Sequence, residues 1–177
     1  MRLDPAAVIG VGALAVILLW WWRSRSDLRR ARLPPELRSA CLVYAECLFQ
    51  STGPVSISAR VDRVYRNAAG VLVLVELKTR ETNRMYQSDV IELSAQRVAL
   101  MAHTGDVVAD YAYIVTERPD GFRMGCHQVR LMAHADVISL ATRRGKLFVE
   151  RVEPQTTCSS GVCRKCAFVQ SCDLPWV

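Results

Sequence analysis

Two apolar runs joined by a turn dominate the hydrophobic pattern of the chain. They lie within Ala59–Arg80, are rich in valine and leucine, and are separated by the turn sequence Asn67-Ala-Ala-Gly70. This arrangement predicts a β-hairpin. The second run, Val71–Val75, is continuously apolar, which is typical of a strand that is buried on both faces.

Patterns on either side of the hairpin predict the rest of the fold. Apolar residues recur at helical spacing before and after it, and a second pair of strands and a third helix follow. The predicted elements are helices over 34–50, 88–103 and 134–146 and strands over 110–116 and 122–131. The order helix, hairpin, helix, hairpin, helix predicts an α/β fold with a short mixed sheet flanked by helices.

An uncharged run of seventeen residues, Ala6 to Trp22, lies near the N-terminus. Its length suits a spanning helix, since the hydrocarbon core takes about 17–25 residues. Three tryptophans end the run and five arginines follow within residues 23–32. The positive-inside rule therefore predicts a single-pass anchor with the N-terminus outside and the rest of the chain cytoplasmic, as in a bacterial inner membrane. The charge order and the absence of a cleavage motif argue against a signal peptide.

Composition divides the chain into four parts. These are a membrane anchor (1–22), a basic linker (23–35), an α/β core (36–150) and a cysteine-rich tail (151–177). The net charge is +6, but residues 1–40 hold seven basic and three acidic residues, or +4, and the remainder holds only +2. The excess charge therefore indicates membrane topology more than affinity for nucleic acid.

Three charged residues accompany the predicted hairpin. Asp62 lies on its first strand, and Glu76 and Lys78 end its second, where alternation places both on one face. Singly, each is ordinarily a surface ion pair or a turn cap. At the end of a buried strand, however, charges are costly unless they are paired or bind metal. Two carboxylates and an ammonium group suit a divalent cation and a phosphate.

The order of Asp62, then Glu76-x-Lys78, resembles the PD-(D/E)XK nuclease superfamily, and VDRVYR…VLVELKTR resembles its RecB-like exonuclease branch. The resemblance covers residues 36–172 and implies a restriction-endonuclease-like core. It implies that Asp62 and Glu76 hold Mg²⁺ or Mn²⁺, with the Leu77 carbonyl as a third ligand. Lys78 would then position the attacking water or stabilise charge on phosphorus.

The same resemblance assigns further residues. Glu46, on the predicted first helix, matches an acid that the superfamily directs to the metal. Gln96 matches a glutamine of the RecB-like branch and is expected to hydrogen-bond the nucleic acid. The branch has a tyrosine where this chain has Leu100, which weakens inferences about DNA contacts at that helix. Arg80, two residues beyond Lys78, is a candidate phosphate contact.

Four of the seven cysteines form a C-x4-C-x2-C-x5-C pattern in the tail: Cys158, Cys163, Cys166 and Cys172. Thiolates at this spacing in a chain that faces the cytoplasm indicate a soft metal more than disulfides, and four thiolates satisfy structural Zn²⁺.

Iron–sulfur members of the RecB-like branch, including CRISPR-associated exonucleases, carry C-x2-C-x5-C after the nuclease core and close a [4Fe–4S] cluster with a distant cysteine. The resemblance therefore implies such a cluster here. Its fourth ligand would be Cys158, or alternatively Cys41 or Cys47.

Three functions compete at this point. The first is a membrane-anchored, metal-dependent nuclease that cleaves DNA, exonuclease-like, with an iron–sulfur C-terminus. The second is a catalytically silent nuclease-fold protein that binds nucleic acid or acts as a scaffold at the membrane. The third is a membrane-bound iron–sulfur electron carrier, which would leave Asp62 and Glu76 unexplained.

Overall fold

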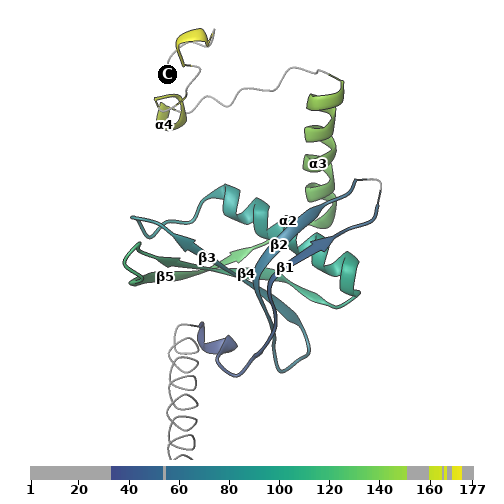
Figure 1. Cartoon of the computed structure of the whole chain (residues 1–177), viewed down its shortest axis with the longest axis vertical. Helices are drawn as coiled ribbons and strands as arrows, with labels where there is room; N and C mark the ends of the chain where they lie inside the picture. The colour runs from purple at the N-terminus through teal and green to yellow at the C-terminus, as the bar shows by residue number, and fades with distance from the viewer. Residues whose placement is uncertain (1–32, 54, 151–159, 165, 167–168, 173–177) are drawn as a thin grey trace, which may run out of the picture. The chain divides into compact units, whose positions relative to one another are not determined.

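A computed structural model describes residues 33–53, 55–150, 160–164, 166 and 169–172 (Figure 1). The chain divides into two compact units, Met1–Ser139 and Leu140–Val177. The predicted anchor over residues 6–22, nearly all of the linker and Cys158 lie outside the described residues. Within the described part of the chain, no helix has the length and apolar character needed to cross a membrane.

The first unit contains a five-stranded mixed sheet in the order β1-β2-β3-β4-β5. Neighbouring strands run antiparallel, except that β3 and β4 are parallel and are connected through helix α2. The elements are β1 (Cys41–Gln50), β2 (Ser58–Arg66), β3 (Leu72–Thr79), α2 (Gln87–Thr104), β4 (Val108–Glu117) and β5 (Arg123–Arg130). The predicted mixed sheet, both hairpins and the helix over 88–103 are confirmed.

The central hairpin of β2 and β3 forms for the local reasons that its sequence suggests. The Asn67 side chain accepts hydrogen bonds of 3.0 Å from the backbone N–H groups of Ala69 and Val71. Gly70 takes a φ of 80°, a conformation that a glycine adopts without steric cost. The turn sets the strand register, in which Arg63 lies opposite Val75.

Helix α2 lies across one face of the sheet (Figure 1). Its apolar side is fully buried at Leu93, Ala99 and Leu100. The even-numbered residues of β3 face this helix, because Glu76 and Lys78 both contact it and side chains alternate along a strand. The helix ends at Gly105, whose φ of 71° lets its N–H bond to the Met101 carbonyl.

The opposite face of the sheet holds a second apolar cluster, which includes Val73, Val75 and Val115. It is covered by a short 3-10 helix, η1 (Pro35–Leu37), whose Leu37 is buried. The hydroxyl of Tyr113 donates to the carboxylate of Glu36 and so fastens η1 to the sheet. Both faces of β3 are therefore covered, as its continuous apolar run predicts.

The prediction of a helix over residues 34–50 is wrong. Only η1 is helical there, and the rest of the segment is the edge strand β1, which pairs with β2 from Cys41↔Arg66 to Gln50↔Ser58. Its residues are mostly exposed, and Leu42 and Leu48 are about half exposed, so its apolar spacing does not mark a buried helical face. Backbone pairing with β2 overrides the local pattern.

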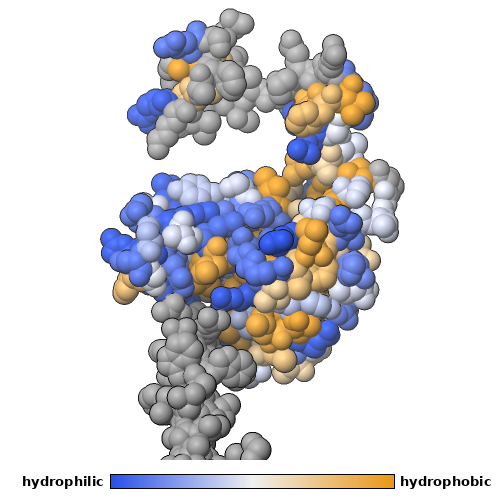
Figure 2. All heavy atoms as spheres, viewed as in Figure 1, coloured by the Kyte–Doolittle hydropathy of each residue, from blue (hydrophilic) through white to orange (hydrophobic). Residues whose placement is uncertain are grey.

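Helix α3 (His134–Val149) spans the boundary between the units and runs three residues further than predicted. The second unit also contains α4 (Ser160–Cys163) and the 3-10 helix η2 (Val169–Ser171). In the space-filling view, hydrophilic residues gather over the end of the sheet where β3 leads into α2 (Figure 2).

Candidate active site

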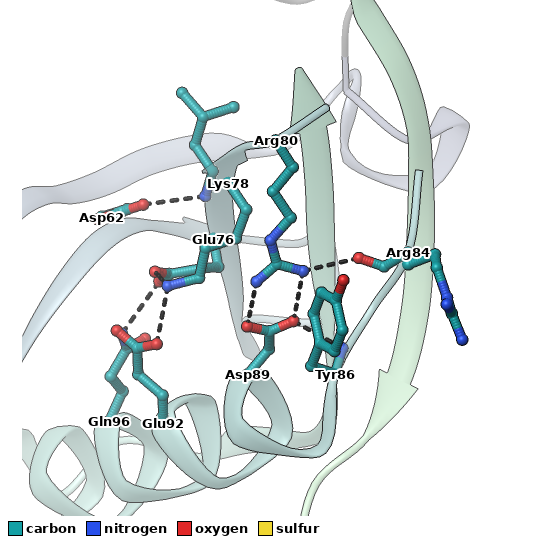
Figure 3. Close-up of polar contacts among 10 residues, drawn as sticks. Asp62, Glu76, Lys78, Arg80, Arg84, Tyr86, Asp89, Glu92 and Gln96 are labelled. Carbon is teal, nitrogen blue, oxygen red and sulfur yellow. Dashed lines mark hydrogen bonds and ion pairs between the residues drawn. The ribbon is translucent and has the colours of Figure 1, made fainter. Parts of the chain in front are cut away.

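A row of polar pairs joins β3 to α2 at this end of the sheet (Figure 3). Two side chains of β3 and the side chain of the residue that follows the strand, spaced two residues apart, contact three side chains of α2. The three on α2 are spaced three and four residues apart. We call these pairs the polar ladder: Glu76 with Gln96, Lys78 with Glu92, and Arg80 with Asp89. Two residues advance about 6.7 Å along a strand and three to four advance about 5 Å along a helix, so successive pairs stay nearly level.

Glu76 is the buried acid of the site, with 3% of its surface exposed. One carboxylate oxygen accepts a 3.0 Å hydrogen bond from the Gln96 amide, and the other lies 2.7 Å from the Lys78 ammonium. Burial raises the pKa of Glu76 above its ordinary value, and the charge of Asp62 adds to the increase. The hydrogen bonds from Lys78 and Gln96 oppose this shift without cancelling it.

Lys78 lies between two carboxylates. Its Nζ is 2.7 Å from Glu76 and 2.7 Å from Glu92, whose side chain is about half exposed. Burial by itself would lower the pKa of Lys78, but hydrogen bonds to Glu76 and Glu92 raise it above its ordinary value. Lys78 is therefore a cation held at a fixed position beside Glu76.

Asp62 enters the site from the neighbouring strand β2. Its Oδ2 accepts a 2.9 Å hydrogen bond from the backbone N–H of Leu77, between the two charged residues of β3. Asp62 comes next to Arg63, which pairs with Val75, so the register brings Asp62 level with Glu76. The structure thus brings together the three residues on which the sequence analysis centred.

Arg80, expected to contact phosphate, forms an ion pair with the buried Asp89. Its two terminal nitrogens lie 2.9 Å and 2.5 Å from the Asp89 carboxylate, and one of them also donates to the Arg84 carbonyl at 2.7 Å. Burial would raise the pKa of Asp89, but hydrogen bonds from Arg80 and from the Tyr86 N–H lower it below its ordinary value. Asp89 is thus a stable anion inside the structure.

Glu46 lies on β1 and not on a helix. Its neighbours Ala45 and Cys47 pair with Arg63 and Val61, so Glu46 falls across from Asp62 on the adjacent strand. Its side chain is exposed. Among the described residues it is the one non-glycine residue with a positive φ, 53°, a conformation that strains an L-amino acid.

The carboxylates of Asp62 and Glu76 suit a hard divalent cation, because a cation would compensate the buried charge of Glu76 and its repulsion by Asp62. No group of three or more His, Cys, Asp or Glu residues is arranged to hold a metal in the described part of the chain. The side chains that the described residues offer to such an ion are thus only two, the carboxylates of Asp62 and Glu76. A further oxygen can come from the backbone carbonyl of Leu77.

The cysteines of the tail are only partly described. The N–H of Cys166 donates to the Cys163 carbonyl at 3.1 Å, which closes a turn between the two. Cys163 and Cys166 are half-buried and Cys172 is exposed. Cys41 and Cys47 are free thiols on β1, in the other unit. The described thiols do not form a metal-binding group, and the iron–sulfur ligand set stays a prediction.

Sequence reasoning did not identify Glu92 and Asp89 as members of the site. The signal was present, because Asp89, Glu92 and Gln96 recur at helical spacing and so share one face of α2. It also did not find Asn83, whose side-chain oxygen accepts from the buried Thr116 hydroxyl at 2.6 Å and contacts His127 at 2.7 Å. No local pattern indicates that contact.

No protein-family model matches this chain, and no curated protein matches it. Among solved structures, the chain is similar to the crystal structure of SSO0001, with 15% identity and a TM-score of 0.44, over 96% of this chain and 75% of that one. It is also similar to an alkaline exonuclease from Laribacter hongkongensis, with 15% identity and a TM-score of 0.40, over 73% of this chain and 61% of the exonuclease. At these TM-scores neither similarity establishes a function.

Proposed function

We propose that this protein is a nuclease that depends on Mg²⁺ or Mn²⁺ and cleaves phosphodiester bonds of DNA. One observation carries the proposal: the buried Glu76 carboxylate lies level with Asp62 of the neighbouring strand and within 2.7 Å of the Lys78 ammonium, near the end of the central strand β3. A buried carboxylate beside a second, half-buried acid is costly unless cations compensate the charge, and a bound divalent metal would add to Lys78 in doing so. The resemblance of these residues to the PD-(D/E)XK motif supports the same conclusion.

Each residue has a separate role in this proposal. Asp62 and Glu76 would hold the metal, with the Leu77 carbonyl as a further oxygen ligand. When bound, the metal supplies polarisation of the phosphate and a bound water of lowered pKa. Lys78 stabilises the negative charge that develops on the phosphoryl oxygens. Gln96 keeps the Glu76 carboxylate in place, and Glu92 keeps Lys78 in place.

The test is a cleavage assay of the full chain on linear and circular DNA with Mg²⁺ or Mn²⁺. Cleavage should require the metal and stop when EDTA is added. We expect Asp62→Asn, Glu76→Gln and Lys78→Met each to reduce the rate by about 100-fold or more, the range for removing one group that stabilises transition-state charge. Glu81→Gln, an exposed glutamate in the loop after β3, is the matched control and should remain active. Full activity of Glu76→Gln would refute the proposal. An exonuclease would spare the circular substrate.

A second candidate is a catalytically silent protein with the same fold that binds nucleic acid or acts as a scaffold. The observation in its favour is that Arg80 and Gln96, both expected to contact nucleic acid, instead contact Asp89 and Glu76 of the chain itself. The same assay separates the candidates, because the silent protein would show no metal-dependent cleavage while still binding DNA or a protein.

We further propose that residues 6–22 anchor the protein in a membrane with the catalytic unit on the cytoplasmic side. The apolar run and the arginines that follow it support this proposal. Membrane fractionation of cells that express the full chain tests it. Recovery of the full-length protein in the soluble fraction without detergent would contradict it.

A further inference from the structure

An exposed aromatic side chain stands beside the last pair of the polar ladder. Tyr86 directly precedes α2, and 46% of its surface is exposed. The guanidinium of Arg80 lies 4.7 Å from the centre of its ring (Figure 3). Arg80 therefore covers part of the ring, while much of the side chain remains accessible. An accessible aromatic face is a surface on which a planar group can stack.

The position of Tyr86 is fixed by the structure around it. Its backbone N–H donates to Asp89 at 2.9 Å, and its carbonyl accepts from the Asp89 N–H at 3.0 Å. Arg80 is itself held by Asp89 and by the Arg84 carbonyl. Because the Tyr86 backbone is hydrogen-bonded and its ring packs against a guanidinium that is itself held, the side chain loses little conformational entropy when a ligand binds, which favours binding.

The loop that carries Tyr86 is also attached to the sheet. Asn83 contacts Thr116 of β4 and His127 of β5. Gly125 of β5 permits this contact, because a Cβ at that position would lie 2.6 Å from the Asn83 amide atoms. The sheet thus holds the loop at its middle, and α2 holds it at its end.

The location of this ring relates it to the candidate active site. Arg80 follows Lys78 by two residues, about 6.7 Å along an extended chain. That distance corresponds to about two nucleotides at the ~3.4 Å spacing of stacked bases. A nucleic acid whose scissile phosphate lies at Lys78 and whose strand continues in the direction of Arg80 would therefore present a neighbouring base near Tyr86. Arg80 neutralises the charge of Asp89, so the Asp89 carboxylate does not repel a phosphate that approaches Tyr86.

We propose that Tyr86 is a stacking platform for one unpaired base of a single-stranded nucleic acid, one or two nucleotides from the scissile phosphate. The inference rests on the proposed nuclease function and adds the strandedness of its substrate. Stacking accepts any base, since every base has a π-face, and it requires a base free of its partner strand. The bound substrate is therefore single-stranded at this position.

The test measures the binding of fluorescent single-stranded oligonucleotides to the full chain in Ca²⁺, with cleavage monitored on a gel. Tyr86→Ala should weaken binding by roughly 5- to 150-fold, the range for the loss of one base–aromatic stack. Tyr86→Phe retains the ring and should bind like the wild type. Phe122→Ala, which removes another exposed aromatic ring, is the matched control and should also bind normally.

A scan with one abasic nucleotide at each position of the oligonucleotide locates the stacked base. For the wild type, one or two adjacent positions should show the same loss, and Tyr86→Ala should be insensitive to an abasic nucleotide there. The inference would be overturned if Tyr86→Ala bound the oligonucleotide as tightly as the wild type. It would also be overturned if an abasic nucleotide weakened the binding of Tyr86→Ala as much as that of the wild type. Both outcomes leave the nuclease proposal intact. Equal losses in Tyr86→Ala and Tyr86→Phe would also overturn the inference. A wild-type chain that neither binds nor cleaves nucleic acid would overturn both.

Discussion

The side-chain amide of Gln96 donates a 3.0 Å hydrogen bond to the carboxylate of Glu76, and both side chains are almost completely buried between α2 and the sheet. The second Glu76 oxygen contacts Lys78. The carboxylate is thus held at both oxygens, by one neutral donor and one cation. This arrangement fixes the orientation of the acid before any metal binds and makes Gln96 a positioning residue.

We expect Gln96→Leu to destabilise the protein by about 1–3 kcal/mol at neutral pH, because the buried carboxylate loses a hydrogen bond. Urea unfolding measures this change. Gln87→Leu, the same substitution at an exposed position of α2, is the control and should have little effect. If Gln96 acted only through a contact with nucleic acid, Gln96→Leu would leave the stability of the free protein unchanged.

The raised pKa of Glu76 predicts how stability changes with pH. Its folded pKa lies above the ordinary value of 4.5, so the folded state binds the proton more tightly than the unfolded chain. The contribution of Glu76 to the free energy of unfolding is therefore largest below about pH 4.5 and falls as the pH rises from there to the folded pKa. The loss is about 1.4 kcal/mol for each unit by which the pKa is raised.

Unfolding curves of the metal-free protein between pH 4 and pH 7 test this prediction. Glu76→Gln should lack the fall, while Glu81→Gln should retain it. Two shifted neighbours act outside this window: the lowered pKa of Asp89 changes stability below its ordinary value of 3.8, and the raised pKa of Lys78 changes it above 10.5. The same pH profile for Glu76→Gln and the wild type would contradict the assignment.

The pair of Arg80 and Asp89 should be structural. We expect Arg80→Ala to cost about 3–5 kcal/mol, because it leaves a buried carboxylate without its cation. The double variant Arg80→Ala, Asp89→Ala should lose clearly less stability than the sum of the two single variants, because it leaves no buried charge without a partner. Chemical denaturation of the four proteins of this cycle gives the coupling energy. Additive losses would instead leave Arg80 available as an independent phosphate contact.

The cysteine tail is expected to bind an iron–sulfur cluster. Protein purified without oxygen should then be brown and lose the colour on substitution of Cys163, Cys166 or Cys172 by serine, because the thiolates hold the iron. If Cys158→Ser loses the colour, all four ligands lie in the tail. If Cys158→Ser keeps the colour and Cys41→Ser or Cys47→Ser loses it, the fourth ligand lies on β1. A colourless protein with about one zinc per chain would exclude the cluster. Metal analysis and visible absorption provide the measurements.

The central hairpin, α2 and the strands that follow could be predicted from the sequence alone. In these segments the local signals agree: the Asn67–Gly70 turn and the helical spacing of α2 specify structures with short-range hydrogen bonds, and the continuous apolar run of β3 indicates a strand buried on both faces. Alternation along β3 also placed Glu76 and Lys78 on one face, and the structure brings Asp62 to the same place.

The first strand and the pairing of side chains within the site depend on contacts between elements that are distant in the sequence. Cys41–Gln50 is a strand because β2 supplies its hydrogen bonds, and an exposed edge strand has no apolar alternation that would reveal it. The residues that bind Arg80 and Glu76 come from α2, nine and twenty positions further along the chain. Which acid meets which base depends on how the helix crosses the sheet. That crossing is set by packing of the apolar face of α2, so no local pattern contains it.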